Sequence, residues 1–549
     1  MPTGGEIVVE TLRRFGVDRV FCVPGESYLG LLDALYGRPD IDTVVCRHEG
    51  GAGFMAVADA RLTGRPGVVC VSRGPGASNA AIAVHTAQQD AVPLVLLVGQ
   101  VAEADLRRDS FQEIDYGFMF GKVAKWTAEA RDPEHLAEIM MRALQVATTG
   151  VPGPVVVALP EDVLTAVTDA GPLGAPTPLS LAPHPETLAT LGAWLSGAER
   201  PLLLAGSGLE RPGGREALLA FAEAWQVPVA VSFRRQDLFP NAHPLYAGDM
   251  GLSNRKDQME ALNEADLVVV AGARLSDITT QGYSWPGLVR PRMRLAHIHA
   301  DAGVIGTQFA ADLALVCEAR DALSRLGRPV MALPPARAAW TARLGAIRAD
   351  IARPKAREAD DGLAFERVVA LMGEHLPDDA IVTVDAGTFG APVYRVVPFR
   401  GTQRLLAPIS GAMGFGVPAA VAAGLREPGR PVICLVGDGG FLMTGGELAV
   451  ALERDLDLKV ILSENGVYAS ILIHQARDYP GRIIGTAFTN PDFELMGRAY
   501  RCEVTRISDE AGLARLPELL RAPGRQFIVV DTSVQAVLAP AKNANVTAP

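Results

Sequence analysis

Short, continuously apolar segments recur along the chain, and they restrict its fold more than any other feature. In the first third they occupy residues 19–23, 43–46, 67–72, 93–99 and 154–159. Segments that are apolar throughout, rather than at every second residue, are typical of parallel strands buried on both faces. Amphipathic segments lie between them, and in 134–148 Leu136, Met140 and Leu144 fall on one helical face. The alternation predicts βαβ units and a doubly wound parallel sheet.

The same alternation returns twice further along the chain. Apolar segments lie at 201–206, 228–232, 265–273 and 294–300, and again at 380–384, 431–437, 458–463 and 526–530. A chain of 549 residues exceeds what one hydrophobic core holds, and residues 171–184 form a linker-like stretch rich in proline and glycine. We therefore expect an α/β fold with three doubly wound parallel-sheet domains in series. Their expected bounds are 1–170, 185–330 and 355–535, with a tail at 536–549.

Composition argues against several classes of protein, including nucleic-acid-binding, membrane-spanning and secreted ones. The formal net charge of −11 argues against a nucleic-acid surface, because phosphate backbones are bound by clustered positive charge. No apolar run reaches the roughly 20 residues that a membrane-spanning helix needs, and the N-terminus lacks the basic start and apolar core of a signal peptide. The six cysteines are scattered without ligand-like spacing, so we expect them to be buried as small hydrophobes. We expect a cytoplasmic protein with no nucleic-acid or membrane partner.

The clearest chemical signal lies where the apolar segment 431–437 breaks into the glycine-rich run GDGG and an apolar helical stretch follows. Glycines let the backbone approach a diphosphate, and the start of the helix offers unpaired N–H groups. Asp438 adds a hard carboxylate suited to magnesium that binds phosphates. Taken alone, the run is also compatible with an ordinary tight turn.

The next strand-like segment, 458–463, ends beside Asn465 and Val467. Asn465 can supply an amide oxygen and Val467 a carbonyl oxygen, and parallel strands place their carboxyl ends at one edge of a sheet. Asp438, Asn465 and Val467 are therefore the predicted magnesium ligands. The pairing of GDG with an asparagine near the end of the next strand resembles the signature of thiamine-diphosphate-dependent enzymes. That family normally shows two consecutive asparagines, and this chain has Glu464 in place of the first.

The first predicted domain carries matching landmarks. Glu49 follows the strand-like segment 43–46 and precedes a helix of small residues at 50–60. A glutamate at a strand end is usually a solvated charge. Here its surroundings, together with the segments VFCVPG, GPGASN and PLVLLVGQV, resemble the family's N-terminal domain. The resemblance spans about residues 4–535 and points to the acetolactate-synthase-like branch, whose GAMGFGVPAA segment is also present.

This resemblance implies a cofactor site with defined roles. Glu49 would share a proton with a ring nitrogen of the cofactor's pyrimidine and favour the tautomer that deprotonates the thiazolium carbon, a role suited to a partly desolvated acid. Met413 would wedge the cofactor into its bent shape, and the Gly411 carbonyl would accept a hydrogen bond from the exocyclic amine. Further implied cofactor contacts are Pro24, Asn79, Gly387, Thr388, Gly437, Gly439, Gly440 and Asn465. In this family the cofactor bridges two subunits, so a homodimer or homotetramer is implied.

The substrate end departs from the acetolactate-synthase pattern. Phe111, Gln112 and Lys125 are retained, and Gln112 is a catalytic candidate. The second arginine of the family's GARFDDR is Ile278 here, which removes a charge-assisted grip on a carboxylate that contributes roughly 1.5–3 kcal/mol. The tryptophan that caps the acceptor pocket is His474, a candidate proton carrier, although a lone histidine is more often structural.

Further positions at this end differ as well. Glu161 stands where the family has lysine, and Asp249 where it has methionine. Arg73 replaces a small residue in SRGPG. It could grip a substrate carboxylate from the opposite wall, or it could bind a phosphate or a helix end, and the sequence does not separate these interpretations. His85 is a second candidate proton carrier with the same structural alternative.

Two questions about cofactor and reaction stay open at this point. The middle domain resembles the one that carries FAD in acetolactate synthases, but its glycine-rich turn at 205–214 also fits an ordinary Rossmann-like turn. Three functions fit the sequence: a carboligase that decarboxylates a 2-keto acid and joins it to a second carbonyl, a 2-keto acid decarboxylase or C–C lyase, and a non-enzymatic protein that binds thiamine diphosphate. Intact Glu49, Asp438 and Asn465 disfavour the third, and we expect the carboligase.

Overall fold

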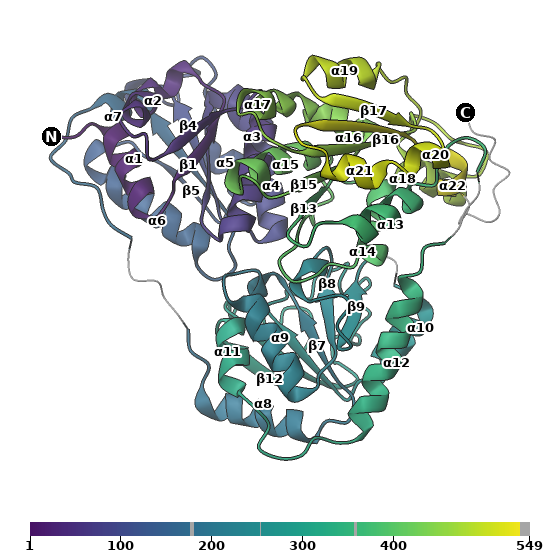
Figure 1. The fold of residues 1–549 in the computed structure, drawn as a ribbon. Helices are drawn as coiled ribbons and strands as arrows, with labels where there is room; N and C mark the ends of the chain where they lie inside the picture. The colour runs from purple at the N-terminus through teal and green to yellow at the C-terminus, as the bar shows by residue number, and fades with distance from the viewer. Residues whose placement is uncertain (176–180, 253, 356–358, 539–549) are drawn as a thin grey trace.

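The structure is a computed structural model that describes residues 1–175, 181–252, 254–355 and 359–538. It contains three six-stranded sheets, and each comes from one continuous part of the chain (Figure 1). All pairings between neighbouring strands are parallel. The predicted fold class is therefore confirmed. The exact domain bounds stay a prediction, and 176–180 of the predicted linker and 539–549 of the predicted tail lie outside the described residues.

The first sheet has the strand order β2-β1-β3-β4-β6-β5. Its strands are β1 (Arg19–Cys22), β2 (Asp42–Val45), β3 (Gly67–Ser72), β4 (Leu94–Gln100), β5 (Trp126–Glu129) and β6 (Pro154–Pro160). The helices are α1 (Gly4–Arg14), α2 (Leu29–Tyr36), α3 (Glu49–Thr63), α4 (Arg73–Asp90), α5 (Tyr116–Phe120), α6 (Leu136–Thr148) and α7 (Glu161–Thr165). The helix predicted at 134–148 is confirmed, because Leu136, Met140 and Leu144 of α6 are all buried.

The central sheet has the order β12-β11-β10-β7-β8-β9, which is the doubly wound order of Rossmann folds. Its strands are β7 (Pro201–Ala205), β8 (Val229–Ser232), β9 (Tyr246–Met250), β10 (Leu267–Ala271), β11 (Arg294–His299) and β12 (Leu313–Val316). Its helices are α8 (Pro185–Gly197), α9 (Gly214–Trp225), α10 (Lys256–Leu262) and α11 (Ala319–Leu326). The long helix α12 (Ala336–Ile351) then leads toward the third unit along the side of this sheet (Figure 1).

The third sheet has the order β14-β13-β15-β16-β18-β17. Its strands are β13 (Ile381–Val384), β14 (Arg404–Leu406), β15 (Val432–Gly437), β16 (Lys459–Glu464), β17 (Glu503–Ile507) and β18 (Gln526–Asp531). Its first helices are α13 (Phe365–His375), α14 (Val393–Val396), α15 (Gly416–Arg426), α16 (Asp438–Thr444) and α17 (Leu448–Glu453). The later ones are α18 (Ala469–Asp478), α19 (Phe493–Ala499), α20 (Glu510–Leu513), α21 (Leu516–Arg521) and α22 (Val534–Leu538).

Alternate residues of the inner strands enter cores on opposite faces of a sheet. In β3, Val69 and Val71 belong to one buried cluster, whereas Val68 and Cys70 belong to another. This two-sided burial explains why the inner strands are apolar at every position. All six cysteines are buried, as expected.

The first and third units share one hydrophobic core along α3 and α15. The rings of Phe54 on α3 and Phe415 on α15 meet edge to face with centroids 5.6 Å apart. At the rim of this contact Arg426 of α15 binds Asp59 of α3 and Asp18, each at 2.8 Å. The packing fixes the first sheet against the third, so the strand ends that carry the candidate site belong to a rigid frame.

The central unit lies below the other two in Figure 1 and is tied to the first by buried ion pairs. Arg61 on α3 binds Glu210 at 2.7 Å, and Arg235 binds Asp90 at the end of α4 at 3.4 Å. Asp90 also accepts the backbone N–H of Ile409 from the third unit. Within the described residues, no helix is long and apolar enough to cross a membrane.

Candidate active site

The end of β15 places Asp438 at the start of α16. Asp438 is 4% exposed, and its Oδ2 accepts the backbone N–H groups of Asn465 at 2.8 Å and Gly466 at 2.7 Å. The side-chain amide of Asn490 donates to the same oxygen at 3.0 Å. The strand ends of β15 and β16 therefore converge on one carboxylate, as the sequence predicted. Asp438 of the GDGG run is thus a buried carboxylate held between the loops after these two strands.

Oxygen atoms suited to a hard cation gather around this carboxylate. Asn465 and Val467 form one tight turn, in which the Asn465 Oδ1 accepts the Val467 N–H at 3.1 Å. The Oδ1 of Asn490 is buried, and no described residue forms a hydrogen bond with it. No group of three or more His, Cys, Asp or Glu side chains in the described part of the chain could hold a metal. The oxygens present suit magnesium bound by one carboxylate, neutral oxygens and phosphates.

Glu464, where the related enzymes have asparagine, closes the other side of this loop. Its Oε1 lies 3.5 Å from the Asn490 amide nitrogen, and its Oε2 forms an ion pair with Arg506 at 3.0 Å. Burial raises the pKa of Glu464, and Arg506 opposes that rise. Arg506 on β17 therefore gives Glu464 a charged partner beside the loop that follows β16.

Three of the predicted diphosphate glycines allow close packing at the same strand end. A Cβ on Gly437 would lie 2.9 Å from the Phe389 ring, and one on Gly439 would lie 2.6 Å from the Tyr468 ring. A Cβ on Gly440 would approach the Asp385 carboxylate at 3.1–3.2 Å. A Cβ at Gly437 or Gly439 would force the neighbouring ring to move, and one at Gly440 would make a tight contact, so this packing favours glycine at all three positions.

The loop that carries Gly411 and Met413 is held by a buried acid that sequence reasoning missed. Asp385, at the end of β13, is 1% exposed and accepts the N–H groups of Gly414 at 2.9 Å and Gly416 at 3.0 Å. Burial raises the pKa of Asp385 to about 6, and these hydrogen bonds oppose the rise. Gly411 has a φ of +68° and open space around its missing Cβ. Only the VDAG context of Asp385 could have suggested this role.

Met413 lies beside the diphosphate loop, as its predicted wedge role requires. Its Cε is 3.5 Å from the position that a Cβ on Gly439 would take. Gly387 and Thr388 come from the next strand end, β13, where Thr388 begins the short 3₁₀ helix Thr388–Gly390. The structure thus brings together at one edge of the third sheet all the predicted cofactor residues of this domain. Which of them contact a cofactor stays a prediction.

Glu49 is the first residue of α3 and is half-buried. Its Oε2 accepts the side-chain amide of Asn79 on α4 at 2.9 Å, and its Oε1 faces Gly76, where a Cβ would lie 3.5 Å away. The preceding His48 caps the helix by accepting the Gly50 N–H. The structure therefore joins two of the predicted residues, Glu49 and Asn79.

Pro24 lies at the neighbouring strand end. It occupies the exposed link between β1 and the 3₁₀ helix Glu26–Tyr28. β1 pairs with both β2 and β3, so the loops after these strands open at the same edge of the first sheet. The predicted N-terminal cofactor residues are therefore neighbours by topology.

Glu447 is a second buried acid that sequence reasoning missed, and it connects the third unit to Glu49. It is 1% exposed, and its Oε1 accepts the backbone N–H groups of Arg47 at 3.1 Å and His48 at 2.9 Å. A Cβ on Gly51 would lie 2.4 Å from that oxygen. Burial raises the pKa of Glu447 to about 7, and the charge of Glu49 adds to the rise. Glu447 therefore holds the segment from which Glu49 projects.

The substrate-end candidates lie on the first unit beside α4. Gln112 is exposed with a φ of +63°, and its carbonyl accepts the Gly74 N–H at 2.9 Å. Arg73 also has a positive φ, +38°, and its Nη2 binds Glu161 at 2.9 Å. Non-glycine residues in this region store strain and concentrate at functional sites. Arg73 is thus paired with the very residue that replaces the family lysine, which leaves its charge partly neutralised.

Two other substrate-end residues have protein partners. The Lys125 ammonium donates to three carbonyls at the end of α6, those of Val146, Thr149 and Val151. His474 lies exposed on α18, where its Nδ1 is 3.0 Å from Arg477 Nη2. Lys125 therefore secures a helix end. The proton-carrying role of His474 stays a prediction.

Comparisons with known proteins divide the chain into the same three parts as the structure. Sequence-family models for the thiamine pyrophosphate enzymes match the chain in three parts: the N-terminal TPP binding domain at 2–118, the central domain at 188–326 and the C-terminal TPP binding domain at 385–531. Glu49 and Asn79 lie within the first match, and Asp438 and Asn465 within the third.

Full-length relatives agree. The acetolactate synthase isozyme 1 large subunit of Escherichia coli is 32% identical, with 98% of this chain and 95% of the relative covered. The acetolactate synthase large subunit of Lactococcus lactis is 31% identical over 93% of this chain and 89% of its own. The probable large subunit of Methanocaldococcus jannaschii is 31% identical over 92% and 87%. With three matched domains, two glycine-lined strand-end sites and full-length relatives, this chain belongs to the thiamine pyrophosphate-dependent enzymes, in the acetolactate-synthase-like branch.

Proposed function

We propose that the chain is a thiamine-diphosphate- and magnesium-dependent carboligase that decarboxylates a 2-keto acid and joins it to a second carbonyl acceptor. The observation that carries this proposal is the buried Asp438 carboxylate, which the two loops after β15 and β16 hold in place. The names of the full-length relatives support the reaction class. When bound, thiamine diphosphate supplies a carbon nucleophile and a sink for the electrons released as carbon dioxide leaves.

The residues would divide the work between the two ends of the cofactor. Asp438, the Asn465 amide oxygen and the Val467 carbonyl would hold magnesium, which offsets the charge of the diphosphate. Glu49 would hold a proton at its carboxylate beside the pyrimidine, and the Asn79 amide keeps that carboxylate in place. Glu447 would act through the start of α3 by fixing the direction in which Glu49 projects.

The proposed assembly is a homodimer or homotetramer with each cofactor site between subunits. Its support comes from apolar side chains that stay exposed beside the site. Leu442 and Met443, on the helix that begins at Asp438, are 44% and 50% exposed, and Ile82, on the helix that carries Asn79, is 41% exposed. Apolar surface next to a polar site is typical of an interface. Sedimentation velocity of the purified chain tests this point, and a monomer at micromolar concentration would contradict it.

FAD gains no support from the glycine-rich turn. A Cβ on Gly206 would lie 2.4 Å from the Ala273 Cα, and one on Gly208 would lie 2.9 Å from the Gly272 Cα. The glycines are therefore accounted for by the close approach of the chain after β7 to the chain after β10. The proposed reaction does not need a flavin, so FAD is left out of it.

A decarboxylase or lyase is the second candidate, because the carboxylate grip of the related enzymes is missing. Ile278 is half-buried in the loop after β10, and Arg73, the possible substitute, is paired with Glu161. An acceptor without a carboxylate loses nothing at Ile278, whereas a keto acid loses its ion pair there. We therefore expect acetolactate formation from pyruvate alone to be weak.

Product analysis decides between these functions. The purified chain, supplied with magnesium and thiamine diphosphate, is incubated with a panel of 2-keto acids, with and without added aldehydes. Carboligase activity gives hydroxyketone or acetohydroxy-acid products, and a decarboxylase gives only the aldehyde and carbon dioxide. The absence of turnover with every substrate would favour the non-enzymatic alternative and contradict the proposal.

A further inference from the structure

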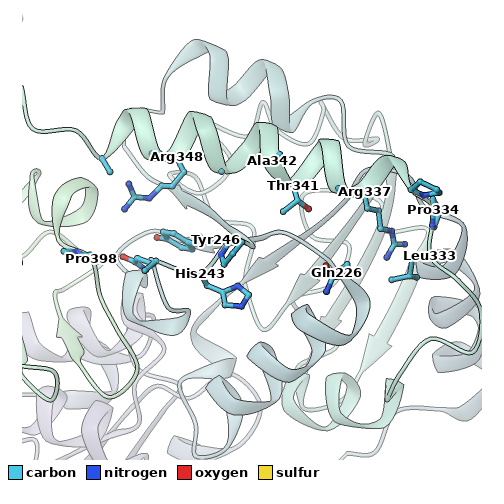
Figure 2. A pocket seen from close by; sticks show the side chains of 18 of the residues that line it. Gln226, His243, Tyr246, Leu333, Pro334, Arg337, Thr341, Ala342, Arg348 and Pro398 are labelled. Carbon is cyan, nitrogen blue, oxygen red and sulfur yellow. The ribbon is translucent and has the colours of Figure 1, made fainter.

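A cavity of about 840 Å³ lies between the connecting helix α12 and the edge strand β9, away from the candidate active site. Figure 2 shows it under α12, with Arg348, Tyr246, His243 and Gln226 around it. Its walls come from the central unit, from α12 and, through Val396 and Pro398, from the third unit. We call it the α12 cavity. Its volume is within the range of about 300–1,000 Å³ that is typical of small-ligand sites.

Apart from one tyrosine, the ionisable side chains that line the α12 cavity are all basic. Two arginines and one histidine line it, and none of its lining residues is an aspartate or a glutamate. This is unusual in a chain whose formal net charge is −11. Arg337 is already engaged, since it donates to the carbonyls of Leu195, Ala198 and Trp225. His243 is engaged as well, since its Nε2 lies 3.3 Å from Glu223 Oε1 and its Nδ1 accepts the Leu245 N–H. The available cation is therefore Arg348.

Arg348 is buried without a full set of partners. It is 9% exposed, its Nη1 makes no hydrogen bond, and no ion pair joins it to a carboxylate of the described residues. Its guanidinium lies over the ring of Tyr246, 5.3 Å from the centroid. Among the described residues, the Tyr246 hydroxyl, on a side chain that is 2% exposed, also has no partner in hydrogen-bond geometry. Burial raises the pKa of Tyr246, and the nearby Arg348 opposes that rise. Two unsatisfied donors side by side in a buried site are costly unless a ligand or water fills the gap.

The nearest acid does not supply the missing partner. Asp249 follows Tyr246 on β9, and burial raises its pKa to about 6, with the charge of Arg348 opposing the rise. No hydrogen bond joins the two side chains among the described residues. Asp249 is also absent from the cavity lining. An anion that enters the cavity would meet Arg348 without competing with an acid that lines the same wall.

The rest of the lining is mostly small and apolar. Representative side chains are Pro244, Leu333, Pro334, Ala338, Ala349 and Pro398. We propose that the α12 cavity binds a small organic monocarboxylate with an apolar tail, with the carboxylate on Arg348 and the Tyr246 hydroxyl and the tail along the alanine and proline side chains. The proposal does not rest on the proposed reaction, because none of the candidate cofactor or catalytic residues lines the cavity.

The probe for this proposal is octanoate, titrated into the full-length chain by isothermal calorimetry. Octylammonium has the same tail with the opposite charge, and acetate has the carboxylate without the tail. We expect octanoate to bind, acetate to bind far more weakly and octylammonium not to bind. Absence of octanoate binding at millimolar concentration, or equal binding of octylammonium, would overturn the proposal.

Two variants then locate the site. Arg348→Met keeps an unbranched apolar side chain and removes the charge, so octanoate affinity should fall about 10- to 100-fold. Arg343→Met is the matched control, because Arg343 lies on the same helix but pairs with Glu264 at the surface. Gly345→Leu adds a side chain facing Pro244, whose carbonyl would lie 3.7 Å from the new Cβ, and should block the tail. Unchanged octanoate affinity in both Arg348→Met and Gly345→Leu would overturn the assignment.

Discussion

The first and third sheets have the same strand order but use their strand ends differently. Counted within each sheet, the order is 2-1-3-4-6-5 in both. The third strand of the first sheet leads into Arg73, whereas the third strand of the third sheet leads into Asp438. The second strand leads into Glu49 in one sheet and to the loop of Met413 in the other. In our proposal, one topology thus gives a proton-sharing edge in the first sheet and a metal-binding edge in the third, and the side chains at the strand ends, not the fold, make the difference.

The hydrogen bonds that Asp438 and Glu49 accept also differ between the two edges. The Asp438 carboxylate is buried and receives three donors on Oδ2, which suits a fixed ligand. Glu49 is half-buried, and its Oε2 receives one amide donor, from Asn79. In the proposed site, its other oxygen would be the one that faces the pyrimidine. A heavily bonded carboxylate favours holding a cation, and a lightly bonded one favours sharing a proton. The predictions below test this division.

The largest expected effect concerns the metal-binding edge. Asp438→Ala should abolish activity at cofactor concentrations that saturate the wild-type protein, because the diphosphate would meet neutral donors without its cation. Steady-state turnover with magnesium and a 2-keto acid measures this. Asp378→Ala is the control, since its side chain is 85% exposed on the same unit. Retained turnover in Asp438→Ala would contradict the metal-binding role proposed for this end of the third sheet.

At the edge of the first sheet, we expect a change of Glu49 to lower the turnover rate and not the binding of the cofactor. Glu49→Gln should lower turnover by roughly 10²–10⁴-fold, the usual range for one acid–base group, with the protein still loaded with cofactor. The control is Glu138→Gln, an exposed glutamate on α6 of the same unit. Turnover near that of the wild-type protein would remove Glu49 from the mechanism.

A third prediction concerns the substrate rather than the cofactor. Ile278→Arg should raise the use of keto-acid acceptors about tenfold, because it restores a charge-assisted contact with the acceptor carboxylate. Acetolactate formed from pyruvate alone measures it, with Ile278→Met as an uncharged control of similar length. Efficient acetolactate synthesis by the wild-type protein would contradict the premise and point to Arg73 as the substitute grip.

The smallest expected effect concerns Glu447 and stability. Burial raises its pKa from 4.5 to about 7, so the folded state loses stability relative to the unfolded state as the pH rises from about 4.5 through about 7. Glu447→Gln stays neutral, and its amide oxygen can still accept the Arg47 and His48 N–H groups. The variant's Tm relative to the wild-type protein should therefore rise between pH 5 and pH 8, by roughly 1–4 °C. Thermal unfolding measured at both pH values tests this, with the exposed Glu453→Gln as control. A Tm difference that is independent of pH would contradict it.

The parts of the fold that the sequence predicted differ physically from those that it did not. All the inner strands were predicted, because burial on both faces makes them apolar throughout. The missed strands are β5, β9, β12, β14 and β17, and each lies at the edge of its sheet. Edge strands pair on one side only, so polar side chains can interrupt them; β5, for example, has no fully buried residue. Short, mixed segments of this kind cannot be told from loops. The exception is β12, whose sequence LALV is apolar throughout and whose absence from the prediction is not explained by composition.

The residues of the candidate site also fall into those that the sequence predicted and those that it did not. Asp438, Asn465 and Glu49 were found because glycines or small residues surround them at strand ends. Asp385 and Glu447 were missed, since their roles depend on backbone N–H groups that are distant in sequence, such as those of Arg47 and His48 for Glu447. A buried acid looks the same as a solvated one in a sequence, and only the folded chain shows what it holds.

The measurement that most directly tests this division of labour is a calorimetric titration of thiamine diphosphate, with magnesium, into the wild-type protein, Glu49→Gln and Asp438→Ala. The account predicts comparable affinity for the first two proteins and no measurable binding to the third. It also predicts that chelation of magnesium makes the wild-type protein behave like Asp438→Ala. Wild-type affinity in Asp438→Ala, or an equal loss in Glu49→Gln, would contradict the claim that the third sheet holds the cofactor and the first sheet activates it.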